Sequence, residues 1–174
     1  MPLTTIWTKM RTLLGTELNF RLRARESNMN YSVIAKDILD SNIYMTLATS
    51  SNTGRPWAAP VYYCFDKKFN FYFISQLSSR HIRHILNNPT IAFAIYDSHQ
   101  KEGVGNGVQG IGKARLLHDR EIPEALKWYK TSFVESKLES FTGKAPYRLF
   151  KIVAKHLYIL DPLAKVDKRI EVKL

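Results

Sequence analysis

The polar residues best suited to chemistry fall in one short stretch, from Ser75 to His81. The stretch follows an apolar run and leads into residues 78–87, whose spacing of isoleucine and leucine predicts a helix. Main-chain N–H groups at a helix start are unpaired and attract anions. The hydroxyls of Ser75 and Ser79 could donate further hydrogen bonds. The Arg80 guanidinium could bind a phosphate through two parallel bonds, with His81 as another donor. The residues predict either a phosphate site or a capped surface helix with a solvated arginine.

A second candidate for ligand contact is the run Trp57–Ala58–Ala59–Pro60–Val61. It lies in a predicted strand, and a proline inside a strand indicates an edge, a bulge or an interruption of the hydrogen bonding. Small side chains beside such an interruption would let the main chain face a flat ligand. An irregularity at the edge of a sheet explains the same residues equally well.

The glycine-rich segment 103–110 imitates a dinucleotide-binding signature. It precedes a predicted strand rather than a helix, so its glycines cannot place a pyrophosphate at a helix start. We interpret the segment as a flexible loop. Gly110 and Gly112 lie in the following strand, where a glycine marks the close approach of a ligand or of a second backbone.

Metal and thiol chemistry are not supported by the sequence. His81 and His84 are three residues apart, but no pattern supplies a third ligand, so we expect no metal. The single cysteine, Cys64, lies in an apolar run and is expected to be buried and inert. No side chain is predicted to act as a general acid or base, so the catalytic residues stay unassigned.

Length and charge limit the classes of protein to consider. The chain has 174 residues and a formal net charge of +11. This length suits one domain, which we place at residues 31–174, after a flexible or partly helical extension at residues 1–30. No apolar run approaches the roughly 20 residues that span a bilayer, and no signal-peptide pattern is present, so we expect a cytoplasmic protein with no membrane partner.

The positive charge favours anionic partners, either a phosphorylated small molecule or a nucleic acid. The aromatic residues alternate with other apolar residues in strand-like runs. They are not interleaved with lysine and arginine, as a stacking platform for bases requires. A nucleic-acid partner is therefore the less favoured reading.

Hydrophobic periodicity predicts the elements that would position the candidate residues. We expect helices at residues 31–40, 78–87 and 120–138, and strands at residues 43–49, 57–65, 69–75, 90–97, 108–117, 155–160 and 167–174, with residues 147–150 unassigned. Short connections between successive strands argue against a parallel sheet, which needs helical crossovers. The prediction is a mainly β fold, an antiparallel barrel with helices at its ends and flanks.

From about Ala35 to Leu117, the order and spacing of these segments resemble the pyridoxamine 5′-phosphate oxidase-like superfamily of FMN-binding split barrels. The resemblance is carried by ILDSNIYMTLAT, GRPWAAPVYY, FNFYFIS, the SSRH helix start, NNPTIAFAIYD and VQGIGKARLL. It implies a Greek-key-like split β-barrel that works as a homodimer with FMN at the subunit interface.

The resemblance also implies roles for individual residues. In similar proteins, the strand that matches Trp57–Val61 lies along the flavin, and the position of Ile74 and Ser75 approaches the ribityl phosphate. The positions of Ser79, Arg80 and His81 hold that phosphate, and many relatives have lysine in place of His81. Gln109 matches a glutamine near the flavin ring. Residues of the partner subunit complete the site.

One departure bears on the substrate. True pyridoxamine phosphate oxidases end with a segment that carries a tryptophan and an Arg-Leu-x-Pro ending, and this chain has neither. We therefore expect an FMN-dependent oxidoreductase with another small-molecule substrate and, as one option, NADH or NADPH as electron donor. The family also contains deazaflavin-dependent and heme-degrading relatives. The alternatives are a flavin-binding or flavin-sensing protein without turnover, and a basic nucleic-acid-binding module.

Overall fold

The computed structural model describes residues 30–129, 138–164 and 166–174. The predicted extension at residues 1–30 lies outside this range except for Asn30, which caps the first described helix, α2 (Tyr31–Ser41). The Asn30 side-chain oxygen accepts a hydrogen bond from the Ser32 N–H at 3.1 Å. No helix in these ranges is both long and apolar enough to cross a membrane.

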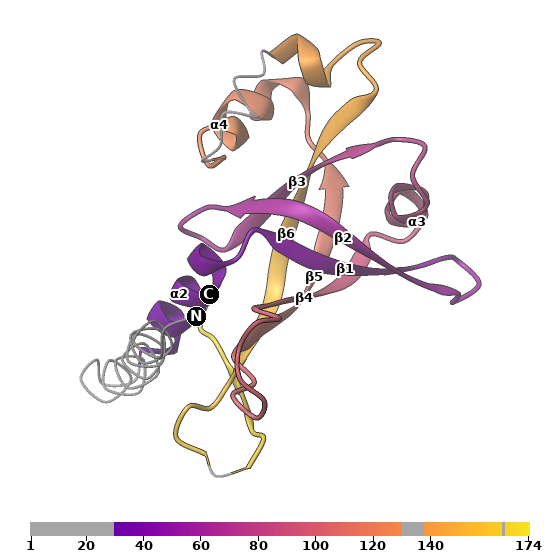
Figure 1. The fold of residues 1–174 in the computed structure, drawn as a ribbon. Helices are drawn as coiled ribbons and strands as arrows, with labels where there is room; N and C mark the ends of the chain where they lie inside the picture. Colours follow the sequence, from indigo (N-terminus) through magenta and orange to yellow (C-terminus); the bar gives the residue numbers. More distant parts are fainter. Residues whose placement is uncertain (1–29, 130–137, 165) are drawn as a thin grey trace, which may run out of the picture.

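The architecture is a barrel of antiparallel strands with short helices around it (Figure 1). The strands are β1 (Tyr44–Ser50), β2 (Pro56–Phe65), β3 (Asn70–Gln76), β4 (Thr90–Tyr96), β5 (Gly107–Leu116), β6 (Tyr147–Leu160) and β7 (Arg169–Glu171). Their order is β3-β2-β1-β4-β5-β6-β7, and a further pairing of β3 with β6 closes six of them into a ring. Because β1 to β3 follow one another and β4 returns beside β1, the topology is a Greek key. The predicted mainly β, antiparallel barrel is confirmed.

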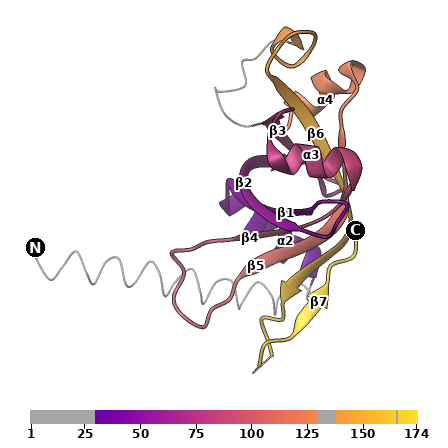
Figure 2. The same ribbon diagram turned by 90° about the vertical axis from the view of Figure 1, so that its right-hand side faces the viewer.

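The helices occupy the ends and flanks of the barrel, as predicted. Figure 2 shows α3 (Arg80–Asn87) lying across one end of the barrel, where it contacts β1, β2 and β5. The short helix α4 (Ile122–Leu126) lies near β3 and β6 at another side. Two 3₁₀ segments, Asp119–Glu121 and Leu138–Phe141, accompany α4.

Period-two alternation fills the barrel with apolar side chains. Met45 and Leu47 of β1 point inward, and Phe71, Phe73 and Phe93 lie in the same core. Ile82 and Ile85 of α3 join this core, so the helix is held by burial of its apolar stripe. A second apolar cluster, with Cys64, Tyr72 and Tyr129 among its members, lies between the strands and α4. Burial raises the pKa of the Cys64 thiol above its ordinary value, as expected for an inert thiol.

Three predicted elements are wrong in extent. The helix predicted at residues 120–138 is interrupted after Leu126. There the chain forms tight turns, in which the N–H groups of Trp128 and Tyr129 donate to carbonyls three residues back. Residues 130–137 of the predicted helix lie outside the described ranges. The strand predicted at residues 155–160 is the second part of a strand of 14 residues, β6, which also includes the unassigned residues 147–150. The final strand is shorter than the predicted 167–174, since only Arg169–Glu171 pairs with β6.

Candidate functional site

The end of β3 and the start of α3 bring three of the predicted phosphate ligands together. Ser75 Oγ lies 2.8 Å from His81 Nε2 and 3.2 Å from Ser79 Oγ, and Ser79 Oγ lies 3.3 Å from His81 Nε2. Ser75 is the most enclosed member, with 8% of its surface exposed. These three residues form a compact cluster of two hydroxyls and one imidazole, which we call the serine–histidine cluster.

Ser79 occupies the N-cap position of α3 but does not cap it with its side chain. An N-cap hydroxyl ordinarily accepts a hydrogen bond from an N–H of the first turn. The Ser79 hydroxyl is instead directed to Ser75 and His81. The first-turn N–H groups of α3 are therefore left without this acceptor, and the helix start keeps its attraction for an anion.

His81 is neutral near pH 7. Burial lowers the pKa of its imidazole below the ordinary value, and His84, one turn further along α3, lowers the pKa in the same direction. Both hydroxyls lie against the same ring nitrogen, Nε2, which in the neutral imidazole accepts from them in one tautomer and donates in the other. A dianion placed beside the ring would reverse this tendency by favouring the protonated form.

Arg80 does not point into the serine–histidine cluster. Its guanidinium carbon lies 4.1 Å from the centre of the Trp57 ring, in a cation–π contact. Along a helix, successive side chains point about 100° apart, so Arg80 and His81 face different directions. The structure thus divides the predicted phosphate ligands into the serine–histidine cluster on one side and Arg80, stacked on Trp57, on the other.

The run Trp57–Val61 lies on a strand that is free along one edge. β2 pairs with β1 from Pro56 to Tyr62 but with β3 only at residues 63–65, so within the described ranges residues 56–62 have no strand partner on their second edge. The Tyr63 N–H donates to the Ile43 carbonyl at 3.2 Å. Because antiparallel strands alternate the direction of these groups, the nitrogen of Pro60 faces the free edge, where its missing N–H breaks no bond to β1.

Two side chains of this run face inward and two face outward. Ala59 and Val61 are buried in the barrel, whereas Ala58 and Pro60 are exposed. The predicted interruption of the sheet is therefore an unpaired edge with small side chains on both faces. Its main-chain groups are available to a flat ligand.

Ile74 and Gln109 lie apart from the serine–histidine cluster within one chain. The Ile74 side chain packs against the second apolar cluster, on the opposite face of β3 from Ser75, so only its main chain can approach a ligand held by Ser75. Gln109 lies on β5, opposite Ala94 of β4, with its side chain exposed. Strands β1 and β4 separate it from β2, a distance of roughly 14 Å at ordinary strand spacing.

A pocket beside Arg80 contains residues that sequence reasoning did not assign. It has a volume of about 350 Å³ and is lined by Ser51, Thr53, Arg55, Pro56, Arg80 and His84. His84 was considered only as a metal ligand, and Arg55 was not considered. The signal was present in the helical spacing, since Arg80 and His84 are four residues apart and therefore share a face of α3.

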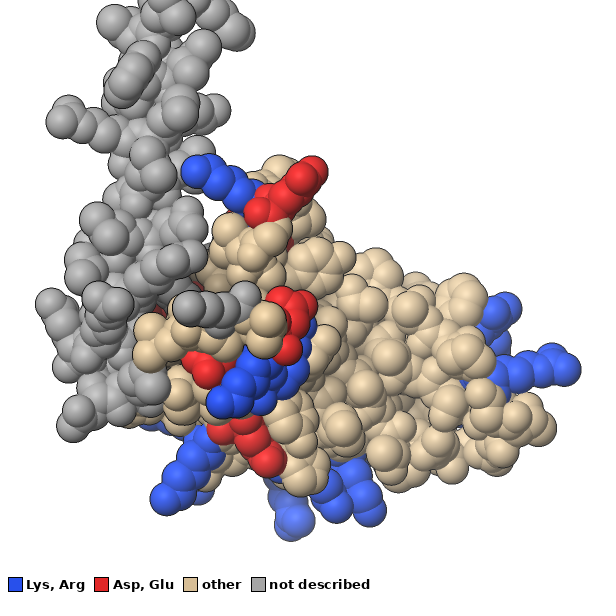
Figure 3. All heavy atoms as spheres, turned by 90° about the horizontal axis from the view of Figure 1, so that it is seen from below, with Lys and Arg blue, Asp and Glu red and all other residues tan. Residues whose placement is uncertain are grey.

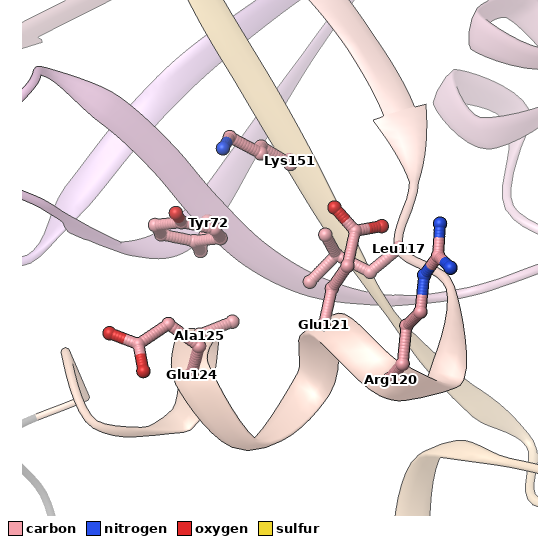
Figure 4. Close-up of a pocket in the computed structure, with 7 residues that line it drawn as sticks. All are labelled: Tyr72, Leu117, Arg120, Glu121, Glu124, Ala125 and Lys151. Atoms are coloured by element: carbon pink, nitrogen blue, oxygen red, sulfur yellow. The ribbon is translucent and has the colours of Figure 1, made fainter.

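Figure 4 shows a second pocket, of about 370 Å³, beside α4. Tyr72, Leu117, Arg120, Glu121, Glu124, Ala125 and Lys151 line it. Arg115 donates to both carboxylate oxygens of Glu121, at 2.8 and 2.6 Å, and chiefly for this reason the pKa of Glu121 falls to about 2. Lys151 lies over the Tyr72 ring, 5.5 Å from its centre. Much of this charge is already partnered, and no sequence-predicted ligand lines the pocket, so we do not assign it a ligand.

Comparison with known proteins places the fold. The chain is similar to a heme binding protein from Mycobacterium smegmatis (TM-score 0.62, 17% identity), covering 79% of this chain and 56% of that one. It is similar to HutZ, a heme storage protein from Vibrio cholerae, with a TM-score of 0.60 and 15% identity over 71% of this chain and 90% of that one. It is also similar to General Stress Protein 26 from Bacillus anthracis str. Sterne, with a TM-score of 0.60 and 19% identity over 82% of this chain and 99% of that one. Identities this low show a shared fold alone.

The chain spans little more than half the length of the Mycobacterium protein. No curated protein sequence matches it. Residues 35–161, by contrast, match a family model described as pyridoxamine 5′-phosphate oxidase. This match covers most of the barrel, from α2 into the end of β6, and includes every candidate residue described above. The chain therefore belongs to the pyridoxamine 5′-phosphate oxidase family.

Proposed function

We propose that the protein binds FMN and acts as a flavin-dependent oxidoreductase on a small molecule. The observation that carries the proposal is the serine–histidine cluster at an uncapped helix start, with the guanidinium of Arg80 next to it in the chain. Within the described ranges, no carboxylate forms an ion pair with Arg80. A phosphate monoester carries about −1.5 to −2 charges at pH 7, and these groups would supply its donors.

Each residue of the cradle would have a distinct task. The hydroxyls of Ser75 and Ser79 would donate to phosphate oxygens, and His81 would bind as a donor through Nε2. Arg80 would leave Trp57 or reach past it to bind the phosphate through two parallel N–H groups. Because Ser75 is nearly enclosed, its hydrogen bond would form away from competing water, where it is stronger.

The flavin ring would lie along the free edge of β2, between Trp57 and Val61. When bound, the isoalloxazine supplies the hydride or electron transfer. The chain's own part would be to hold the ring with the unpaired main-chain groups of β2 and to leave room for it with the small exposed side chain of Ala58. No acid or base is needed at these positions for this chemistry, and we assign none.

We further propose that the protein is a homodimer joined through the outward face of the barrel. Where the three strands lie side by side, the outward residues of β1, β4 and β5 are Tyr44, Thr46, Ala48, Ala92, Ala94, Tyr96, Gln109 and Ile111, and none of these is charged. The charged outward residues of β5, Lys113 and Arg115, lie further along that strand and border the patch. Tyr44 is 57% and Tyr96 55% exposed, which leaves two large rings uncovered at the edges of a patch of alanines. Seen from below the barrel, the molecule has a broad area without charged side chains (Figure 3).

The homodimer explains the position of Gln109. Within one chain it is too far from β2 to contact a flavin held there, but it lies on the proposed dimer face. A second copy could bring its own Gln109 to the flavin of the first.

The test of flavin binding is the absorption spectrum of freshly purified protein, followed by titration of flavin-free protein with FMN. We expect the spectrum to show absorption bands near those of free flavin. In the titration, Ser79→Ala should bind FMN at least about tenfold more weakly than wild type, because the variant loses a hydrogen bond to a charged group. Ser78→Ala is the matched control, because Ser78 is exposed and outside the cluster. No uptake of FMN, or equal losses in both variants, would reject the proposal.

The homodimer is tested separately by sedimentation. Wild type should sediment as a dimer. Ala92→Arg, which places a charge at the centre of the proposed face, should give a folded monomer that binds FMN weakly. A monomeric wild type would refute this part.

Heme binding is the second candidate function, because one histidine has a carboxylate partner of the kind that metal-ligating histidines have. His156 Nδ1 lies 2.6 Å from a carboxylate oxygen of Glu171, and the His156 ring stacks on Tyr158 at 6.3 Å. A carboxylate on one ring nitrogen directs the other toward a metal, and two of the similar structures are named for heme. The same spectrum decides, since a Soret band that His156→Ala abolishes would favour heme over FMN.

A further inference from the structure

Two buried hydroxyls lie at the end of the barrel that α3 covers. Among the described residues, Thr49 and Ser75 have the buried polar side chains other than those of tyrosine and cysteine. Thr49 continues the inward alternation of Met45 and Leu47 along β1, and Ser75 has the corresponding inward place on β3. A buried hydroxyl without a partner is costly, so each of the two is expected to be hydrogen-bonded.

Each hydroxyl is bonded to a histidine of α3. Ser75 Oγ lies 2.8 Å from His81 Nε2, and Thr49 Oγ1 lies 3.2 Å from His84 Nδ1. The two histidines are three residues apart and are therefore neighbours on the surface of the helix. The proposed function gives the first pair to the phosphate of FMN and leaves the second pair without a task.

The Thr49 hydroxyl has a second partner on β2. Thr49 lies opposite Trp57 where β1 pairs with β2, and its Oγ1 lies 3.4 Å from the Trp57 carbonyl oxygen. A carbonyl oxygen only accepts, and a hydroxyl has a single hydrogen to donate. The Thr49 hydroxyl therefore donates to Trp57. Its bond with His84 runs the other way, from the imidazole Nδ1–H to Oγ1, so a neutral His84 carries its hydrogen on Nδ1.

These bonds join the two elements that would hold the two ends of FMN. The phosphate cradle lies at the start of α3, and the free edge proposed for the flavin ring lies on β2. Thr49 is 4% exposed and faces the inside of the barrel, so it would not touch the ligand itself. A further bond, from the Asn88 side-chain amide to Ser50 Oγ at 3.0 Å, ties the other end of α3 to β1.

We propose that Thr49 is a positioning residue of the flavin site, which sets the separation between the phosphate cradle on α3 and the ring edge on β2. The inference rests on the proposed function. A ligand that spans two elements binds more tightly when both are already held at its own length, because less conformational freedom is lost on binding. Removing the Thr49 hydroxyl leaves every ligand-binding group present but frees the two elements to shift relative to each other.

The experiment compares Thr49→Val, which keeps the shape of the side chain and removes its hydroxyl, with Thr49→Ser, which keeps the hydroxyl. FMN affinity is measured by titration of flavin-free protein. Thr49→Val should bind FMN at least about fivefold more weakly than wild type, the factor that corresponds to one neutral hydrogen bond. Thr49→Ser should stay within about twofold of wild type. Thr90→Val makes the same chemical change at an exposed position of β4 and should leave FMN affinity unchanged.

Two changes of His84 test the same bond from the helix. His84→Asn places an amide N–H close to the position of Nδ1, so this variant should keep FMN affinity within about twofold of wild type. His84→Gln places its amide near the position of Nε2 and should weaken FMN binding as much as Thr49→Val. His84 is half-buried on a surface helix, so both variants should fold, and the test does not depend on the folding of Thr49→Val.

Nitrogen NMR of flavin-free protein with labelled histidine gives a readout that a loss of stability alone would not change. At about pH 9 histidine is neutral, and its tautomer can be read from the two ring nitrogens. His84 should carry its hydrogen on Nδ1 in wild type and in Thr49→Ser. In Thr49→Val the hydrogen should move to Nε2, the tautomer that free histidine favours in water. A wild-type His84 with its hydrogen on Nε2 would overturn the inference.

The FMN titrations separate this inference from the proposed function. If wild type takes up FMN, equal affinity in Thr49→Val would overturn the inference alone. So would a loss that Thr49→Ser does not restore, or a loss of the same size in Thr90→Val. A wild type that takes up no FMN would refute the proposed function and, with it, the role of Thr49.

Discussion

Replacing Arg80 by alanine should weaken FMN binding more than it weakens the fold. In the FMN-free protein, the guanidinium has one described contact, the Trp57 ring at 4.1 Å. A cation–π contact at an exposed site contributes about 0.5–1 kcal/mol. Alanine is at least as good a helix former as arginine, so the helix itself does not suffer. We expect the free energy of unfolding to fall by less than about 1 kcal/mol.

The loss of FMN affinity follows from the same contact. A hydrogen bond to a charged group contributes about 1.5–3 kcal/mol, and wild type must give up part or all of the Trp57 contact to form it. The difference between the middle values is about 1.5 kcal/mol, which corresponds to about tenfold weaker binding. A second parallel hydrogen bond from the guanidinium would enlarge this factor.

The assay is quenching of FMN fluorescence on titration with flavin-free protein, paired with urea unfolding of the same samples. Arg83→Ala is the matched control, because it removes the same charge from the next turn of α3, where Arg83 donates to the Ser78 carbonyl at 3.0 Å. Equal FMN affinity in wild type and Arg80→Ala would refute the assignment of Arg80. So would a loss in Arg83→Ala of the same size, since the effect would then be general electrostatics.

Three other substitutions test the fold and its titrating groups. Gly110→Ala should lower the free energy of unfolding by about 1–3 kcal/mol, because its Cβ would lie 2.1 Å from the buried Phe93 ring; thermal unfolding measures this. The pKa of His81 is lowered in the fold, so on acidification the unfolded protein takes up the proton first. The free energy of unfolding should therefore keep its full value above about pH 6.5 and fall below that pH. His81→Gln should flatten this part of the pH profile, measured by urea unfolding of flavin-free protein. Glu121→Gln should lower the free energy of unfolding by no more than about 1 kcal/mol at pH 7, because the ion pair with Arg115 is partly exposed. In wild type, the stabilisation from this pair is present above pH 4.5 and disappears as the pH falls to about 2. Wild type and variant should therefore unfold alike at about pH 2.

The strands of the barrel were predictable where one face is buried throughout. In β1 and β4 the buried side chains alternate without a break, and the predicted bounds differ from the observed ones by at most one residue at each end. Only the second part of β6, residues 155–160, was predicted as a strand, because the alternation of buried side chains changes phase along β6. Phe150 and Ile152 are buried in its first half, and Leu157 and Ile159 in its second. The change follows a bulge where β5 shifts register between Ile111 and Gly112, and periodicity alone does not predict a bulge.

The two glycines near this bulge show what local sequence can indicate. Gly112 was expected to mark the approach of a ligand or a second backbone, and its Cβ would meet the Val153 carbonyl oxygen at 2.5 Å. The backbone approach is therefore confirmed at Gly112. Gly110 instead faces the Phe93 ring across the strand pair, so at this position the close neighbour is a side chain.

The candidate site was predictable as a set of residues but not as an arrangement. Spacing along the chain placed Ser75, Ser79 and His81 near a helix start, and the structure joins them. The position of Arg80 depends on a long-range neighbour, Trp57 of β2, which no local pattern identifies. Arg55 was missed for the same reason, since the β1–β2 turn reaches α3 only after the barrel has formed.

Flavin binding and dimerisation would be thermodynamically linked if Gln109 completes the site from the second copy. One chain holds the serine–histidine cluster and the free edge of β2, but its own Gln109 lies across two strands from that edge. A ligand that binds only the assembled site stabilises the assembly by mass action, so added FMN would tighten the dimer. The affinity for FMN would in turn rise with protein concentration up to the point where all chains are paired. The uncharged sheet face would then be as much a part of the flavin site as the phosphate cradle, since a substitution on either would weaken both equilibria.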